Sequence, residues 1–321
     1  MPIAESATAL EFEALGTRWY VDAAGGLPHA LRTSIAAELE RVDAVWSRFR
    51  ADSMVSSLAR DGGSRTLAPH HLGLLRWYAR LYDATDGAVT PLIGQTLSDA
   101  GYDAAVGLRP RPEIATTPAW DHRSQLRARG IALDRPLLFD VGAAGKGYAV
   151  DRVADLIRAA GIDAYIVDGG GDIAVGTATH LIGLEHPIWP DRLIGTARIS
   201  GGDPAHADPG GPGGSGGSAD AGGSGDLGHS AICGSATNRR AWGDWHHILN
   251  PRTSRPTTEV IAAWAIADSA MHADGLATAL FFVPPGRLAH LGPFDYIVVH
   301  GDGTIERTDS AALTIFDGDA A

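Results

Sequence analysis

The feature that most constrains the fold is the succession of elements between residues 137 and 176. An apolar run (LLFDV, 137–141) leads into a glycine-rich turn (GAAGKG, 142–147) and then into helical spacing from Tyr148 to Ala160. A second apolar run (AYIVD, 164–168) follows and ends in another glycine turn (GGGD, 169–172). Short apolar runs bounded by turn signals are typical of buried strands. The segment therefore predicts a βαβ-like unit, and the pattern leaves open whether its strands are parallel.

The rest of the chain also mixes strands and helices. Alternating apolar residues from Leu10 to Ala23 predict a strand pair interrupted by Gly16, and residues 104–136 are expected to be irregular with short strands. Apolar residues at helical spacing predict helices, and short apolar runs predict strands. The predicted helices are Leu31 to Phe49, Leu72 to Thr85 and Met271 to Leu280, and the further strands begin at Ser230 and span Ala262 to Ala267, Tyr296 to His300 and Ala312 to Phe316.

One stretch, residues 201–229, has a composition unlike the rest of the chain. It is almost entirely Gly, Ser, Asp, Ala and Pro, which bury too little apolar surface to offset chain entropy. We therefore expect a disordered Gly/Ser-rich insertion between strands, because flexible loops are extruded at small entropic cost. The fold class expected for residues 1–321 is α+β, one compact unit of mixed sheets flanked by helices.

Charge and sequence ends restrict the partners and the location. The net charge is −12, so no global positive field attracts nucleic acid, and the single cysteine, Cys233, excludes an internal disulfide or a thiolate zinc cluster. No stretch approaches the roughly 18 unbroken apolar residues of a membrane span. The opening MPIAESATALEFEALGT lacks the basic start and apolar core of an export signal. We expect a cytoplasmic protein with no membrane span and no nucleic-acid partner.

Two segments could bind anions or cations. DVGAAGKGY resembles a phosphate loop, but that motif needs Gly at 140 and a hydroxyl at 147, where Asp140 and Gly147 stand. Lys146 in a glycine turn before a helix is either an anion cradle or a plain turn residue. Asp274 and Thr278 are four residues apart, so they share a helix face and could hold a hard cation such as Mg²⁺; the alternative is a helix-start acid and a satisfied hydroxyl.

Adjacent histidines occur in WHHILNPRTSRP (245–256), before an Asn-Pro turn. A histidine in this position could be a base, a ligand or only a strand-end residue. No HExxH pair points to zinc, and Ser235 lacks the GxSxG context of a serine hydrolase. The histidines alone therefore do not define the chemistry.

Seven blocks in order resemble the ApbE family of FAD:protein FMN transferases and span nearly the whole chain. The most specific are FDVGAAGKGYAVD, HHILNPRTSRP and ADGLATALF, because together they match the family's lysine loop, histidine segment and closing helix. Phe49 stands where the family has a tyrosine, and Thr90 where it has an aspartate. The blocks are ALGT (14–17), WSRFRADSMVSSLA (46–59), DGAVTPLIG (86–94), FDVGAAGKGYAVD (139–151), VDGGGDIAVG (167–176), HHILNPRTSRP (246–256) and ADGLATALF (273–281).

The resemblance implies a T-fold-like arrangement of mixed sheets and a set of site residues. Asp274 and Thr278 would bind Mg²⁺ through side chains and Ala143 through its carbonyl oxygen. His247, with a pKa expected near neutrality, would be the base toward the acceptor, in preference to His246. Phe49 would offer a flat face for stacking. FAD would lie against Leu15, Phe49, Ala88, Val89, Thr90, Asp140, Lys146 and Ile248.

The activity implied by the resemblance is Mg²⁺-dependent transfer of FMN from FAD to a Thr or Ser hydroxyl of an acceptor protein, releasing AMP. FAD is then a substrate, and Asp274 and His247 carry the chemistry. Two alternatives stay open: an Mg²⁺-dependent FAD pyrophosphatase, in which water replaces the hydroxyl, and a non-catalytic flavin-binding or electron-transfer module. The last needs no divalent cation, so Asp274 and Thr278 argue against it.

Overall fold

The structure, a computed structural model, describes residues 4–5, 9–189, 191–201 and 229–316. The expected insertion coincides with residues 202–228 and so lies outside the described residues. In the described part, a large sheet runs in the order β1-β2-β3-β7-β8-β11-β16-β17-β18, with every neighbouring pair antiparallel. Its strands are β1 (Ala4–Glu5), β2 (Ala9–Ala14), β3 (Thr17–Ala23), β7 (Tyr165–Asp168), β8 (Asp172–Val175), β11 (Ala231–Ala236), β16 (Val260–Ala267), β17 (Asp295–His300) and β18 (Ile305–Arg307).

Smaller sheets and the helices complete the molecule. A three-stranded sheet has the order β19-β10-β9, and a second has the order β4-β6-β5. The strands are β9 (Thr179–Glu185), β10 (Leu193–Ser200), β19 (Leu313–Ile315), β4 (Gly63–Thr66), β5 (Leu126–Arg127), β6 (Gly130–Leu133) and the pairs β12 (Ala241–Trp242) with β13 (Trp245–His246) and β14 (Leu249–Asn250) with β15 (Arg255–Pro256). The helices are α1 (His29–Trp46), α2 (Met54–Asp61), α3 (Pro69–Ala84), α4 (Gly94–Asp99), α5 (His122–Gln125), α6 (Gly145–Ala159), α7 (Ala270–Ala279) and the 3₁₀ turns η1 (Pro91–Ile93), η3 (Thr237–Arg240), η4 (Pro285–Arg287) and η5 (Ala289–Leu291).

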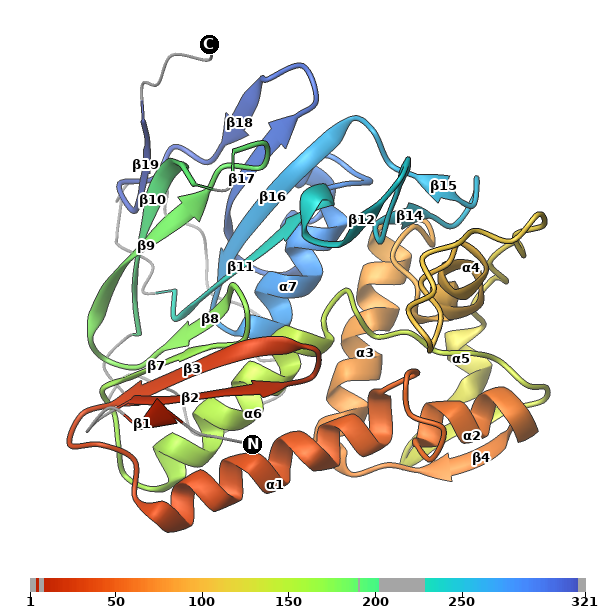
Figure 1. Ribbon diagram of the computed structural model, residues 1–321, viewed down its shortest axis with the longest axis horizontal. Coiled ribbons are helices and arrows are strands. Elements are labelled where there is room, and N and C mark those ends of the chain that lie inside the picture. The colour runs from red at the N-terminus through yellow and green to blue at the C-terminus, as the bar shows by residue number, and fades with distance from the viewer. Residues whose placement is uncertain (1–3, 6–8, 190, 202–228, 317–321) are drawn as a thin grey trace.

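The large sheet is covered on both faces, and β16 shows how the sequence achieves this. Ala263 and Ala265 belong to the core shared with the helices, whereas Ala262, Trp264 and Ile266 belong to a second core shared with β9 and β10. Successive side chains of a strand point to opposite faces, so an apolar run serves both cores. The result is three layers, helices, large sheet and small sheet; Figure 1 shows α6 and α7 behind the large sheet and the β9–β10 hairpin beside it.

Most predicted elements are confirmed, with boundaries moved by a few residues. The strand pair around Gly16 is β2 and β3, the three predicted helices are α1, α3 and α7, and the helix after the glycine turn is α6, which begins at Gly145. The α+β class with mixed sheets flanked by helices is confirmed by these elements. The strand β10, which ends at Ser200, is in the small sheet, and the strand β11, which begins at Ala231, is in the large one.

The predicted strand at residues 137–141 is wrong. Leu137, Phe139 and Val141 are buried, as a strand pattern requires, but this segment joins none of the sheets. The N–H of Asp140 donates instead to the carbonyl of Pro91, 2.8 Å away. The apolar alternation therefore fits an extended segment that packs into the core without a strand partner, and the unit is not βαβ.

A close approach of α6 and α7 requires glycine at position 147. A Cβ added there would lie 2.0 Å from the carbonyl oxygen of Ala270 and 2.8 Å from Cβ of Asp274. Asp151, on α6, accepts from the N–H groups of Ala270 (2.8 Å) and Met271 (2.9 Å), which ties the start of α7 to α6. The motif GKGYAVD thus fixes how the two helices meet.

We expect Gly147→Ala to lower the free energy of unfolding by about 1–3 kcal/mol, the usual cost of overpacking a core. Urea denaturation followed by circular dichroism measures it. Gly73→Ala, within α3, is the matched control, since an added Cβ there meets no atom within 4 Å; alanine in a helix interior should raise stability slightly. Equal stability of Gly147→Ala and the parent would contradict the packing account.

Candidate active site

A cavity of about 880 Å³ lies where the β2–β3 turn, the end of α1, the turn before α6 and the helix α7 come together. All twelve residues singled out in the sequence line it, although they come from segments spread over more than 260 positions. They are Leu15, Phe49, Ala88, Val89, Thr90, Asp140, Ala143, Lys146, His247, Ile248, Asp274 and Thr278. The roles of these residues stay predictions. The structure adds that all twelve line the same cavity.

Three residues with oxygen donors, Ala143, Asp274 and Thr278, line the α7 side of the cavity. The hydroxyl of Thr278 lies 3.4 Å from the carbonyl oxygen of Ala143 and 3.3 Å from the Ser235 hydroxyl. Asp274, one turn earlier on α7, is buried, and its Oδ2 accepts from the N–H of Gly147 at 3.0 Å. The Ala143 peptide is held in place by Tyr78, whose hydroxyl accepts its N–H at 3.0 Å. The side chains and the carbonyl therefore point to one region.

Charges in this region leave a negative excess. Lys146, in the first turn of α6, forms an ion pair with the fully buried Asp172. Burial alone would lower the pKa of Lys146, but the carboxylates of Asp172 and Asp274 raise it, so the lysine stays positive. Burial and the charge of Asp172 raise the pKa of Asp274. Two carboxylates facing one ammonium give a site that an added cation would neutralise.

The two adjacent histidines differ in their partners. His246 uses both ring nitrogens, because Nε2 lies 2.8 Å from the carbonyl of Thr257 and Nδ1 accepts from the N–H of Ile248 at 3.2 Å. His247 lines the cavity, and its buried Nδ1 has no partner among the described residues. His247 is therefore the histidine available to a ligand.

The expectation of a near-neutral pKa for His247 is wrong. Burial and the positive charge of Arg240 lower the pKa of His247 to about 3. The imidazole is consequently neutral throughout the range from pH 5 to 8. The sequence could not show this low pKa, because it does not reveal that the turn η3 brings the charge of Arg240 near the ring of His247.

The wall that holds Phe49 is built from stacked aromatic and arginine side chains. The Phe49 and Tyr102 rings meet edge to face with centroids 5.3 Å apart, and the Arg48 guanidinium lies 4.3 Å from the Phe49 centroid. Arg48 is buried and pairs with Asp140, yet its Nη2 has no hydrogen-bond partner among the described residues. Phe49 itself is 40% exposed, so one ring face is open to a planar ligand.

Two other predicted contacts, Leu15 and Thr90, stand at chain turns whose backbone conformation the structure defines. Leu15 and Gly16 form the two-residue tip of the β2–β3 hairpin, with φ of 51° and 72°. A non-glycine residue in this left-handed region is strained, and such strain is found at functional sites. Thr90, buried, accepts from the N–H of Leu92 at 3.2 Å and so starts the turn η1. Its hydroxyl thereby orders the segment from Ala88 to Thr90 along the cavity.

Sequence reasoning missed several residues that line the cavity. Arg48 stands in the block WSRFRADSMVSSLA (46–59), next to Phe49. The basic residues that follow Ser235, Arg239 and Arg240, could have suggested an anion site. Tyr102 gave no signal, because its segment looks irregular. Asp172 follows the GGG turn and is the ion-pair partner of Lys146. The cavity-lining residues that the sequence did not indicate are Arg48, Tyr102, Arg239 and Arg240.

Comparison with known proteins agrees with this cavity. The family model described as "ApbE family" matches residues 15–292. A FAD:protein FMN transferase of Vibrio cholerae is 27% identical over 275 residues, which cover 80% of this chain and 74% of the relative. A FAD:protein FMN transferase of Treponema pallidum is 26% identical over 270 residues, which cover 79% and 71%.

Solved structures show the same fold. The flavin transferase ApbE from Vibrio cholerae superimposes with a TM-score of 0.68 at 21% identity, covering 97% of this chain and 98% of that one. The ApbE protein from Thermotoga maritima gives a TM-score of 0.72 at 21% identity, covering 96% and 97%. The family match and the curated relatives together define an enzyme of the transferase class. The chain belongs to the ApbE family.

No helix among the described residues is long and apolar enough to cross a membrane. The cytoplasmic location stays a prediction.

Proposed function

We propose that this enzyme transfers FMN from FAD to a Thr or Ser hydroxyl of an acceptor protein, forming a phosphoester and releasing AMP, in a reaction that requires Mg²⁺. The observation that carries the proposal is that one cavity contains both an oxygen-donor set beside Lys146 and a neutral histidine with no partner at Nδ1. The names of the curated relatives support the same reaction.

The residues at the α7 side fit Mg²⁺. The donors are a carboxylate, a hydroxyl and a carbonyl, all hard oxygen ligands, and Thr278 Oγ1 and Ala143 O are 3.4 Å apart. Neighbouring ligands of octahedral Mg²⁺ are about 3 Å apart. The negative excess of Asp274 and Asp172 over Lys146 also favours a bound cation. When bound, the ion would neutralise charge on the pyrophosphate.

The chain's own groups have distinct parts in the transfer. The acceptor hydroxyl attacks the phosphorus of the FMN half of FAD, His247 takes the hydroxyl proton, and the bond to the AMP phosphate breaks with its electron pair leaving on AMP. Lys146 contributes a fixed positive charge beside the phosphates. Phe49 and Arg48 hold the planar end of the dinucleotide, because both line the cavity, Phe49 is 40% exposed and Arg48 Nη2 has no hydrogen-bond partner among the described residues.

Mass spectrometry tests this proposal. The enzyme is incubated with FAD, Mg²⁺ and the protein fraction of source cells that lack it, and peptides are searched for FMN on Thr or Ser. We expect an adduct together with AMP, and neither product when EDTA removes the Mg²⁺. Free FMN and AMP without an adduct would instead identify a pyrophosphatase. Intact FAD would identify a flavin carrier.

A further inference from the structure

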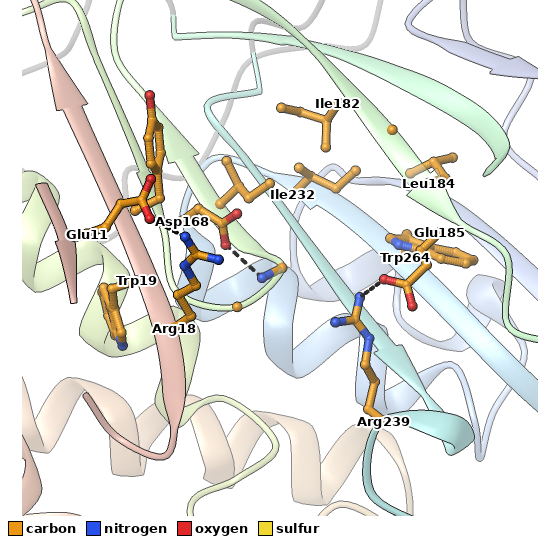
Figure 2. A pocket seen from close by; sticks show the side chains of 15 residues that line it. Glu11, Arg18, Trp19, Asp168, Ile182, Leu184, Glu185, Ile232, Arg239 and Trp264 are labelled. Atoms are coloured by element: carbon orange, nitrogen blue, oxygen red, sulfur yellow. Dashed lines mark hydrogen bonds and ion pairs between the residues drawn. The ribbon is translucent and has the colours of Figure 1, made fainter. Parts of the chain in front are cut away.

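A second cavity, of about 490 Å³, lies on the face of the large sheet away from the helices, along the strand β9. Figure 2 shows its side chains: Arg18 and Asp168 on one side, Ile182 and Glu185 of β9 on the other, and Arg239 at one end. Its volume falls in the range of about 300–1,000 Å³ usual for ligand sites. None of the predicted site residues lines it, so the flavin reaction as derived does not use it.

The strand β9 is an edge strand. Among the described residues it pairs only with β10, in the sheet order β19-β10-β9. Alternate backbone N–H and C=O groups of such a strand point away from its partner and can pair with another extended chain. Gly183, in the middle of β9 and exposed, has no side chain to obstruct such a chain.

The groove borders the candidate active site. Gly170 and Arg239 line both cavities. Arg239 comes from η3, after β11, and its guanidinium pairs with Glu185 of β9 at 3.0 Å, as Figure 2 shows. This ion pair therefore stands where the β9 groove meets the reaction cavity. A segment lying along β9 would pass it on the way to His247.

The lining suits an uncharged extended segment. Ile173, Ile182, Leu184, Ile232 and Trp264 form an apolar floor. The arginines are already paired, Arg18 with Glu11 and Arg239 with Glu185. Recognition of an anionic ligand by these arginines would require breaking those pairs, whereas main-chain pairing with β9 and small apolar side chains on the floor would not.

We propose that the acceptor protein docks here: the extended segment that carries its Thr or Ser hydroxyl adds as a strand to the open edge of β9 and enters the reaction cavity past Arg239. This docking rests on the proposed FMN transfer, since only a protein acceptor needs a groove outside the FAD cavity. It assigns β9 to the protein substrate and the first cavity to FAD.

Site-specific labelling tests the docking. Cys233 is fully buried, so one introduced cysteine is the only reactive thiol in the described structure. Gly183→Cys places a thiol in the middle of β9, on the outer face that also carries Leu193, so that a bulky label there would obstruct a strand added at the edge; its Cβ would lie 2.9 Å from Cδ1 of Leu193, a half-exposed side chain that can move. Ala37→Cys, exposed on α1 in the helical layer, is the matched control. Both variants are coupled to maleimide-polyethylene glycol.

We expect the label on Gly183→Cys to slow FMN transfer by about tenfold or more, equivalent to about 1.4 kcal/mol of lost docking free energy. The substrate is the acceptor protein identified by the mass spectrometry above. FAD affinity of the labelled and unlabelled forms should agree, and labelled Ala37→Cys should transfer normally. Acceptor in excess should also protect the Gly183→Cys thiol from maleimide, and not the Ala37→Cys thiol.

The outcomes separate the two proposals. Unchanged transfer by labelled Gly183→Cys, without protection by acceptor, would overturn the docking and leave the FMN transfer standing. If the label turned a dimer into a monomer in gel filtration while transfer stayed normal, β9 would be a contact between copies of this chain and the docking would be wrong. Absence of any FMN adduct with the unmodified enzyme would overturn both proposals.

Discussion

Asp274→Ala is expected to abolish Mg²⁺-dependent turnover. Asp274 is the only charged side chain in the proposed ligand set, and loss of several kcal/mol of transition-state stabilisation corresponds to about 10³-fold in rate or more. Thr278→Ala should have a smaller effect, about tenfold, because water can replace a neutral hydroxyl. AMP release, measured against Mg²⁺ concentration, gives both values.

Asp274→Asn separates charge from structure. The amide oxygen can still accept from the N–H of Gly147, as the carboxylate does at 3.0 Å, so the contact between α6 and α7 is kept while the charge is removed. We expect this variant to melt like the parent and still be inactive. Asp268→Asn, an exposed carboxylate just before α7, is the control and should keep full activity. Parent-like activity in either Asp274 variant would remove the metal assignment.

His247→Ala is expected to slow transfer by about 100-fold to 10,000-fold, the usual reach of general base catalysis. FAD and Mg²⁺ binding should stay nearly unchanged, because the Nδ1 of the ring holds no group of the described residues in place. Fluorescence titration with FAD and single-turnover FMN transfer measure the two quantities independently. A fall in FAD affinity in proportion to the rate would show that His247 only shapes the pocket.

His246→Ala provides the contrast. Its ring links the backbone of Ile248 to the carbonyl of Thr257, so its loss should loosen the strand that lines the cavity. We expect FAD affinity and transfer rate to fall together in this variant, the opposite of the His247 pattern. The pH profile gives a further check: since the pKa of His247 is about 3, protonation of this base should cause no loss of rate between pH 8 and 5. Burial and Asp172 raise the pKa of Asp274, so a loss of rate in this range that comes from Asp274 should be reversed by more Mg²⁺, which competes with the proton.

The sequence by itself determined the helices and strands that depend on interactions between residues close together in the chain. Apolar spacing predicted α1 and α3, because a helix that buries one face repeats every three or four residues. Alternation around Gly16 predicted β2 and β3, whose two-residue turn needs a glycine in the left-handed region. The order of the motif blocks was enough to name twelve residues that line the cavity, because members of one family share a fold and so bring the same motif positions together.

Only the tertiary structure decided what depends on neighbours far along the chain. The apolar alternation of Leu137, Phe139 and Val141 is compatible with a strand, but a strand also needs a partner, and Asp140 donates to Pro91 instead. The pKa of His247 depends on burial and on Arg240, and the charge around Asp274 depends on Asp172, more than 100 residues away. Electrostatic and hydrogen-bond energies act through space, so residue order does not encode them directly. The pairing of the strands likewise leaves one edge of β9 without a partner strand among the described residues, and no local sequence pattern predicts this.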